Sequence, residues 1–464
     1  MRDNPPIAAN YPPMSGAITW CRGLMDRILG PMQKLEQIGS TNKGIMDREE
    51  AKEVKKVYSN VLESFEEYVQ IKIEEWGRDV ETSSEAKLKL PLLRKLEQQY
   101  RGYNTLAVNF DPGLVRLLRE VKYFLLLGLE VPDSALQIYK KAEVFRRQTG
   151  NLDLIVNMYN SMIKSLLPVE EPLVKGFFTN INNTVKRGLA NLTWKSHGID
   201  SFLSDSMTQV NGCFAITNTL KKNLAQAGVI MDSWTDVPLF KRTEKPRSFQ
   251  EFEEDTLRAL RVARFQVIKE GGNGIHQLVK ESNKILKVSQ GLPDWKAYVD
   301  FVNNIVVSGL SKVVVVSLQA LLEEVDPARI KKLDKSPMIE IAMDLQADRV
   351  VFTPNLFSDE SKKSKKVSVR NIVDGWVDSF YKPGTIVRRL DGAGTFTKEL
   401  KEGMHVRAYT NKINKAFSVV VRECEEFQQT YNEFSHLWLE DMQATFDAFL
   451  VGATTETTAS GLKL

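Results

Sequence analysis

The stretch NLTWKSHGIDSF (191–202) contains the side chains of a nucleophilic triad, Ser196, His197 and Asp200. In such a triad the imidazole takes the hydroxyl proton and the carboxylate orients the imidazole. The three groups normally converge from separate segments beside an oxyanion hole, whereas adjacent Ser and His side chains diverge. No donor-rich turn accompanies them. We therefore expect no catalytic site here.

The same stretch is better interpreted as a corner between two helices. One apolar stripe ends near 188–192, and another begins near Ile199. Trp194 is then a large buried anchor, Gly198 a permissive backbone position and Asp200 a negative charge at a helix start. The sequence predicts an architectural role for this structural corner.

Two glycine-containing stretches could hold a phosphate or a calcium ion. EGGNGIH (270–276) lacks a preceding strand and the third glycine of a dinucleotide fingerprint, and no Walker A string occurs in the chain. DGAG (391–394) lacks the alternating carboxylates of a calcium loop. We interpret the first stretch as a helix-breaking turn and expect no cofactor.

Histidine and cysteine spacing gives no metal site. None of the four histidines has a second His or Cys at ligand spacing. The three cysteines, Cys21, Cys213 and Cys424, lie far apart and form no CxxC pair. A small and odd number of cysteines favours reduced, buried thiols in the cytosol over a disulfide framework. We expect no metal and no catalytic residue.

A basic cluster is the main charged feature, and it contains no interleaved aromatic residue. It comprises Lys362, Lys363, Lys365, Lys366 and Arg370. A solvated loop is the simpler interpretation, and docking onto an acidic protein surface is the alternative.

Composition excludes several partner classes. The formal net charge of +4 over 464 residues is too small for a nucleic-acid or anionic-membrane footprint. The longest uninterrupted apolar runs, 123–129 and 313–316, are far below the roughly 20 residues of a membrane span. The charged, Pro-rich start does not resemble a signal peptide, although whether Met1 is a native start stays open. We expect a soluble intracellular chain that binds neither nucleic acid nor membrane.

Helical periodicity dominates the chain. Asp47 with Glu50 predicts a capping box, and the following stripe of valines and aromatics from Val54 to Trp76 predicts a buried face. Asp111 before Pro112 predicts the start of the next helix. We expect Gly128 and Pro132 to end it, Asp133 to cap its successor and Gly150 to end that one. The last long helix is expected near 406–449, followed by a linker or disordered tail.

One segment has a period of two instead. MIEIAMDLQADRVVFTP (338–354) alternates apolar and polar residues on both sides of a polar turn, which predicts a β-hairpin lying on a helical bundle. The predicted fold class is mainly α, an elongated series of antiparallel helical bundles with one short hairpin near 338–354.

Five segments follow from the breaks in this pattern. They are a helical segment with a Pro-rich lead (1–105), a bundle (106–230), a second bundle after a turn-rich connector (231–335), the hairpin with the basic loop and a helix (336–400), and a long helix with a flexible tail (401–464).

Several of these strings resemble the N-terminal tail of axonemal dynein heavy chains, most closely those of outer arms. The similarity is concentrated in 110–160, LPVEEPLV (167–174) and LTWKSHGID (192–200), and begins at PPMSGAITWCRGLMDRILGPMQ (12–33). It continues as scattered apolar positions through 293–306, 344–356 and 371–390.

This resemblance implies a role that the residues alone do not. The family's tail is a series of helical bundles that binds intermediate chains, light chains and other heavy chains, and thereby attaches the motor indirectly to the doublet microtubule. The ATPase ring of the minus-end-directed motor lies far C-terminal of the tail. The resemblance thus implies a non-catalytic assembly scaffold in the cytoplasm and cytoskeleton, at the axoneme of a cilium or flagellum.

Two other hypotheses stay open. The chain could be a motor-unrelated helical scaffold or tethering protein with a similar bundle pattern. A helical enzyme is the third, and it requires a catalytic constellation that none of the motifs above supplies.

The bundle-series hypothesis makes a measurable prediction. A compact globule of this length has a radius of gyration of about 23 Å. We expect small-angle scattering to give a clearly larger value, and a value close to 23 Å would contradict the elongated arrangement.

Overall fold

The computed structural model describes most of the chain, and it divides into two compact units. The described residues are 5–7, 10–42, 44–242, 245, 247–328, 339–346, 349–356 and 368–460. Unit 1 is Met1–Asn218 and unit 2 is Thr219–Leu464. The five segments expected from the sequence remain a prediction, and the boundary expected at 105/106 falls inside a strand.

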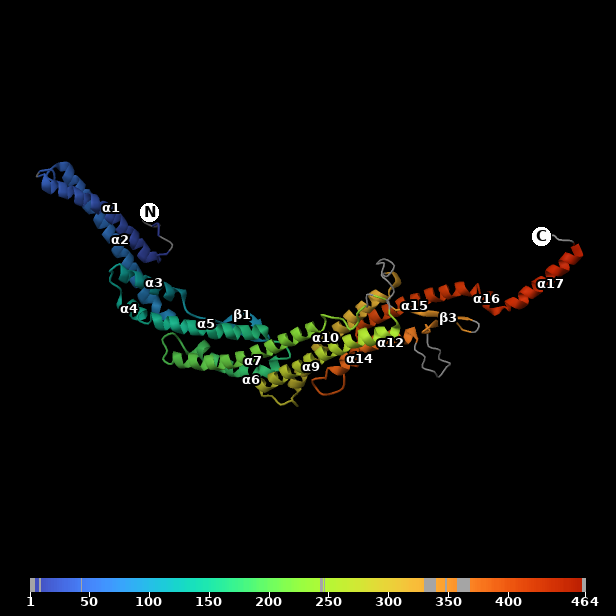
Figure 1. Cartoon of the computed structure of the whole chain (residues 1–464). Coiled ribbons are helices and arrows are strands. Elements are labelled where there is room, and N and C mark those ends of the chain that lie inside the picture. Colours follow the sequence, from blue (N-terminus) through green and yellow to red (C-terminus); the bar gives the residue numbers. More distant parts are fainter. Residues whose placement is uncertain are drawn as a thin grey trace. The chain divides into compact units, whose positions relative to one another are not determined.

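The elements of unit 1 are mostly helices that follow one another through short connections (Figure 1). They are α1 (Pro13–Thr41), α2 (Glu49–Leu88), β1 (Leu93–Tyr100), β2 (Tyr103–Val108), α3 (Pro112–Leu126), α4 (Asp133–Tyr139), α5 (Ala142–Ser165), α6 (Glu171–Lys186) and the π-helix η1 (Arg187–Asn191). Helix α7 (Ile199–Ser233) begins in unit 1 and ends in unit 2.

Unit 2 is also mainly helical (Figure 1). Its elements are α8 (Phe249–Glu251), the π-helix η2 (Phe252–Arg258), α9 (Ala259–Leu286), α10 (Pro293–Val325), β3 (Ala342–Gln346), β4 (Arg349–Thr353), α12 (Val369–Phe380), α13 (Pro383–Ile386), α14 (Thr397–Glu402), α15 (Met404–Asn432), α16 (His436–Leu439) and α17 (Met442–Ser460).

The predicted fold class, mainly α with a short hairpin near 338–354, is confirmed. Strands β3 and β4 pair antiparallel with Met343 opposite Phe352. The turn at 347–348 lies outside the described residues. The hairpin is anchored on a helix, as expected for a marginal two-stranded sheet, because the Gln428 side chain of α15 donates to the Val350 carbonyl.

A second hairpin, β1–β2, was not predicted. Its turn is Arg101-Gly102, and both residues have positive φ (49° and 79°), as a two-residue hairpin turn requires. Helix α5 packs on β2, where the Asn160 amide accepts from the Leu106 N–H and donates to the Leu106 carbonyl, both at 2.9 Å. The amide therefore satisfies a backbone pair at the outer edge of the strand.

The start of α1 depends on a buried carboxylate from another helix. Glu120 of α3 is 4% exposed and accepts hydrogen bonds from the backbone N–H groups of Met14 (2.8 Å) and Ser15 (2.9 Å). An anion at a helix N-terminus satisfies its unpaired N–H groups and interacts favourably with the helix dipole. This contact fixes α1 on α3.

Helix boundaries set by local chemistry are mostly as expected. The Asp111 side chain accepts from the Gly113 N–H at 2.6 Å, and α3 begins at Pro112, which confirms the predicted cap. Gly128 adopts a φ of 68° just after that helix, as expected for a C-terminal stop. The prediction for Asp133 is wrong in detail, because the N-cap is Pro132 and Asp133 is the first helical residue.

Two expectations for α2 are wrong. The capping box at Asp47 does not form, since α2 begins at Glu49 without a side-chain cap. The stripe on α2 is only partly covered: Tyr68 and Trp76 are buried, whereas the valines from Val54 to Val61 are exposed. Trp76 packs on α3, with its ring centroid 4.5 Å from that of Phe124, and the exposed valines precede this contact in the chain.

The C-terminal part also differs from the expected single long helix and flexible tail. The helix breaks after Asn432 and again after Leu439, and residues 442–460 form α17. The break before α17 is fixed by Asp441, whose side chain accepts from the N–H groups of Gln443 and Ala444.

Glycines expected to break helices lie inside them. Helix α5 runs through Gly150, and α9 runs through the EGGNG stretch. A Cβ on Gly271 would lie 2.5 Å from Trp234 Nε1 and 2.8 Å from Ile230 Cγ2, so this glycine lets α9 approach the end of α7 closely. The Asn223 amide reinforces the approach by donating to the Leu278 carbonyl and the Ser282 hydroxyl.

Helix α10 is the central apolar helix of unit 2. By length and composition it could cross a membrane, with a mean hydropathy of 2.0 over its best 18-residue window. Many of its apolar side chains, among them those of Val302, Leu310 and Leu321, are buried, and the helix packs on α12, α14 and α15. The Gln319 amide, for example, donates to the Tyr409 hydroxyl at 2.6 Å. These contacts indicate a core helix, a type that passes the same test.

The close approach at Gly271 can be tested against a matched glycine. Gly271→Ala should lower the free energy of unfolding by about 1–3 kcal/mol, because the added methyl group must displace Trp234 and Ile230. Gly228→Ala, in α7, has nothing within 4 Å and should raise it by up to about 1 kcal/mol through helix propensity. Urea unfolding followed by tryptophan fluorescence measures both, and equal effects would contradict the packing explanation.

Candidate functional site

The corner at 191–202 is built around Trp194. The indole is 3% exposed, and its Nε1 donates to the Asn109 carbonyl at 2.9 Å. Its ring lies edge-on to Phe110, with centroids 4.8 Å apart, and to Phe145 of α5 at 6.2 Å. The side chain therefore joins the segment before α3 to α5 and to the corner.

Gly198 and Asp200 lie where the chain enters α7. Gly198 has a φ of 85°, in the left-handed region that favours glycine. Asp200 lies in the first turn of α7, and its Oδ2 is 3.0 Å from Arg147 Nη2, while Gln148 Nε2 donates to Oδ1 at 3.2 Å. The carboxylate thus links α7 to α5 and adds negative charge at a helix N-terminus.

The triad-like residues do not converge in this geometry. The Ser196 hydroxyl accepts from the Thr193 N–H at 2.9 Å, which closes a turn, and His197 is exposed. In the structure as described, no hydrogen bond joins Ser196, His197 and Asp200. A nucleophile needs its base within hydrogen-bond reach, so this arrangement offers only turn chemistry.

A surface ion pair lies beside the corner. Lys195 Nζ is 2.8 Å from Glu85 Oε1 of α2. The hydrogen bond and charge of Lys195, with a further contribution from Lys89, lower the pKa of Glu85. Because these groups are solvent-exposed, the pair contributes little to stability.

Other chemistry-bearing residues of the described ranges form no site. No group of three or more His, Cys, Asp or Glu side chains there could hold a metal ion. Asp391 accepts from the Ala393 N–H at 3.0 Å and pairs with Arg389, which makes DGAG a closed turn. Burial raises the pKa of Cys213 to about 12, so this thiol is not a thiolate nucleophile at neutral pH.

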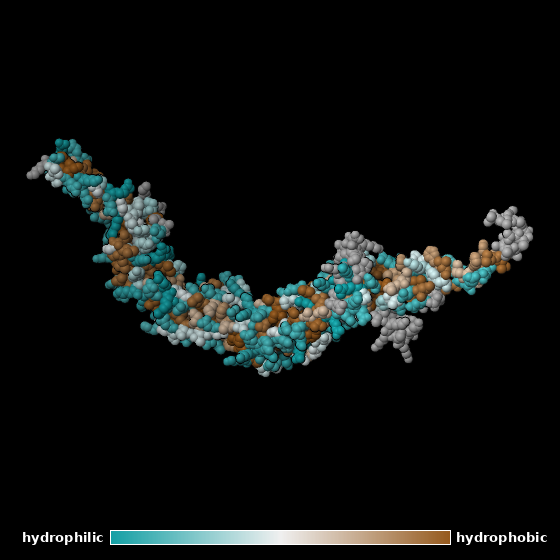
Figure 2. Space-filling view, viewed as in Figure 1, coloured by the Kyte–Doolittle hydropathy of each residue, from teal (hydrophilic) through white to brown (hydrophobic). Residues whose placement is uncertain are grey.

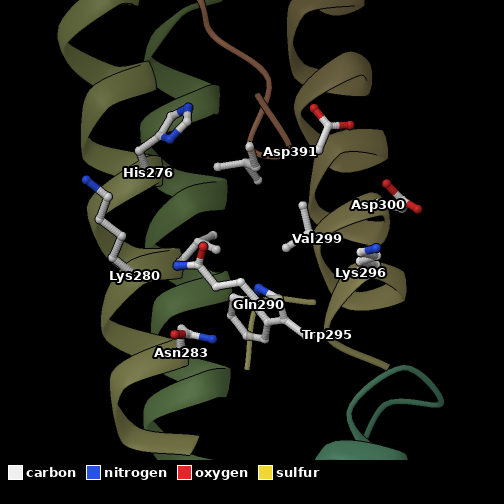
Figure 3. Close-up of a pocket in the computed structure, with 11 residues that line it drawn as sticks. His276, Lys280, Asn283, Gln290, Trp295, Lys296, Val299, Asp300 and Asp391 are labelled. Carbon is white, nitrogen blue, oxygen red and sulfur yellow. The ribbon is translucent and has the colours of Figure 1, made fainter. Parts of the chain in front are cut away.

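A pocket of about 480 Å³ lies in unit 2 between α9 and α10 (Figure 3). His276, Lys280 and Asn283 line it from α9, and Trp295, Lys296 and Asp300 from α10. Figure 3 shows these two sets on facing helices. Gln290 and Asp391 complete its polar rim.

The polar groups of this pocket are partly engaged within the chain. His276 Nε2 lies 3.0 Å from the Arg388 carbonyl, and the Asn283 amide donates to the Val288 carbonyl. Trp295 is buried and stacks on Tyr298 with ring centroids 5.4 Å apart. The pocket pairs no nucleophile with a base, so its geometry indicates a junction between helices.

The basic cluster is only partly described. Lys362, Lys363, Lys365 and Lys366 lie outside the described residues. Arg370 Nη2 is 2.9 Å from Asp374 Oδ1 and donates to the Asn414 amide oxygen of α15, and the guanidinium lies over the Phe417 ring. This side chain therefore links α12 to α15 within the chain, and its expected role as a partner contact stays a prediction.

Comparison with known proteins assigns the chain to a family. Residues 1–202 match the family model described as dynein heavy chain, N-terminal region 1. The flagellar outer arm dynein beta chain of Chlamydomonas reinhardtii is 35% identical over 97% of this chain. The ciliary dynein beta chain of Heliocidaris crassispina is 28% identical over 97%, and human dynein axonemal heavy chain 9 is 26% identical over 96%.

The chain belongs to the dynein heavy chain family and corresponds to the N-terminal region of such chains. It spans 10% of the length of each of these three relatives. The family model ends at the corner, whereas the relatives match along both units. The similarity to dynein heavy chains therefore extends beyond residues 1–202, which the family model covers.

The corner makes a prediction about stability. Trp194→Ala should lower the free energy of unfolding by roughly 3–5 kcal/mol, because it removes a buried ring. His197→Ala removes an exposed side chain three residues away and should change it by less than about 0.5 kcal/mol. Thermal unfolding by circular dichroism measures both, and a small loss for Trp194→Ala would contradict the anchor role.

Proposed function

We propose that this chain is a non-catalytic assembly segment of an axonemal dynein heavy chain of the outer-arm type. The observation that carries the proposal is the 35% identity to a flagellar outer arm beta chain over 97% of this chain. The segment acts as a scaffold that binds intermediate chains, light chains and neighbouring heavy chains. In this way it attaches the motor indirectly to the doublet microtubule.

The absence of a built catalytic site among the described residues supports the scaffold role. The triad-like residues do not converge, the buried Cys213 thiol is protonated at neutral pH, and the glycines of EGGNG pack one helix on another. The chain spans a tenth of the length of these relatives. We therefore propose that the ATPase and microtubule-binding activities of the parent motor lie elsewhere in the longer protein.

The relatives also support a location. Their names refer to flagella, cilia and axonemes, and on this basis we place the chain in the axoneme of a cilium or flagellum. We expect the lysines at 362–366 to contribute a partner contact, because a cluster of like charge favours an acidic partner surface.

Retention of outer-arm subunits tests this function. The purified 464-residue chain is immobilised and incubated with salt-extracted axonemal proteins, and bound subunits are quantified by mass spectrometry. We expect dynein intermediate chains to be enriched over a blank matrix. Retention of unrelated proteins without any dynein subunit would instead favour a motor-unrelated tether.

The contribution of the lysine cluster needs a charge-matched control. Changing Lys362, Lys363, Lys365 and Lys366 together to Glu should lower intermediate-chain retention at least about threefold if the cluster is a contact. The control changes four exposed lysines elsewhere to Glu, namely Lys221, Lys222, Lys269 and Lys284. Equal losses in the two variants would show a general charge effect and would remove the cluster from the interface.

A further inference from the structure

A strip of exposed apolar side chains runs along the end of unit 2, over α16, α17 and the last turns of α15. Figure 2 shows hydrophobic residues gathered there. We call this the C-terminal strip, and it comprises Phe427, Phe434, Leu437, Leu439, Met442, Phe446 and Phe449. Each of these side chains is between 50% and 67% exposed. Exposed apolar patches of this kind mark interaction sites.

The strip includes one face of a regular helix. Met442, Phe446 and Phe449 are spaced i, i+4 and i+7 in α17, so they lie on the same face. A helix face with three large apolar side chains at this spacing has the shape that another helix covers by ridge-into-groove packing. The spacing therefore favours a helical occupant.

The strip also continues an interface that exists within the chain. On α15, the side chains of Val406, Ile413, Phe417 and Val421 are buried, and this helix packs extensively on α10. Beyond Val421, the large apolar side chains of the helix become exposed, beginning with Phe427. The helix-on-helix packing mode of α15 thus extends toward a region where the described chain supplies no covering helix.

The charge around the strip identifies the kind of helix that fits. From Glu425 to Phe449 the sequence has six carboxylates and no Lys or Arg. They are Glu425, Glu426, Glu433, Glu440, Asp441 and Asp447, and all are exposed. Asp441 caps α17 and Glu426 faces Arg422 at 3.7 Å, so most of this negative charge has no cation beside it among the described residues.

We propose that the C-terminal strip receives an amphipathic α-helix with a basic polar face that lies outside these 464 residues. Its apolar face covers the strip, and its lysines or arginines pair with the surrounding carboxylates. A second copy of this chain would bring the same carboxylates together, and an anionic membrane would repel them. This inference does not depend on the partners proposed above.

The test uses designed helical peptides as probes on the intact chain. One fluorescently labelled 18-residue peptide has Leu at i, i+3, i+4 and i+7 positions and Lys elsewhere, and its matched partner has Glu in place of Lys. We expect the Lys peptide to bind at least about tenfold more tightly than the Glu peptide, with a difference that shrinks as salt rises. Equal affinities of the two peptides would overturn the basic-partner assignment.

Matched variants locate the binding face. Phe446→Ser with Phe449→Ser should weaken Lys-peptide binding about tenfold or more, since truncated apolar anchors carry much of an interface's affinity. The control, Leu126→Ser with Val229→Ser, changes two exposed apolar residues outside the strip and should leave the affinity unchanged. Unchanged binding by the first pair, with helicity checked by circular dichroism, would overturn the location.

Two measurements distinguish other occupants. Light scattering at increasing protein concentration should show a monomer for both the parent chain and the Phe446→Ser, Phe449→Ser variant. A dimer that the two substitutions abolish would assign the strip to a second copy and overturn the proposal. Sedimentation with phosphatidylserine vesicles should leave the chain in solution, and strip-dependent pelleting would likewise overturn it.

Discussion

The structure depends on one constraint, which is that each apolar helix face must be covered by another element. Burial of apolar surface is the dominant favourable term in folding, and the long helices have few other sources of stability. Unit 2 satisfies the constraint around α10, whose residues from Val302 to Leu321 lie among α12, α14 and α15. The glycines of α9 belong to the same solution, because only a residue without Cβ lets the backbone approach Trp234.

Polar side chains lie between or beside the packed helices and connect them. Glu120 is buried and yet satisfied, because two N–H groups at the start of α1 donate to it. Asp200 and Arg370 act similarly nearer the surface, since Asp200 joins α7 to α5 through Arg147 and Arg370 joins α12 to α15 through Asn414. Side chains that look suited to catalysis or docking are thus engaged in holding helices together, which agrees with a region whose relatives are parts of large dynein chains.

The sequence predicts features that depend on neighbours along the chain. Asp111 before Pro112 is sufficient to start α3, and alternation is sufficient to find β3 and β4. Prediction from the sequence fails where a contact with a residue far away in the chain determines the local structure. Gly271 was expected to end a helix, and only the packing of Trp234 against it explains why a glycine stands there. The charged strand β1 shows no apolar alternation, because only its ends are covered. For the corner, the residue types pointed to Trp194, but the partners Asn109 and Phe145 required the fold.

The Asn160 amide on β2 has a consequence for how this region behaves among other proteins. A two-stranded sheet exposes unpaired backbone groups that can recruit a strand from any neighbouring chain. At Leu106 those groups are already occupied by the side chain of α5, which donates and accepts as a further strand would. The hairpin is thereby protected there from indiscriminate edge-to-edge aggregation, so that a protein packed at high density with others of its kind associates through side chains that can discriminate between partners.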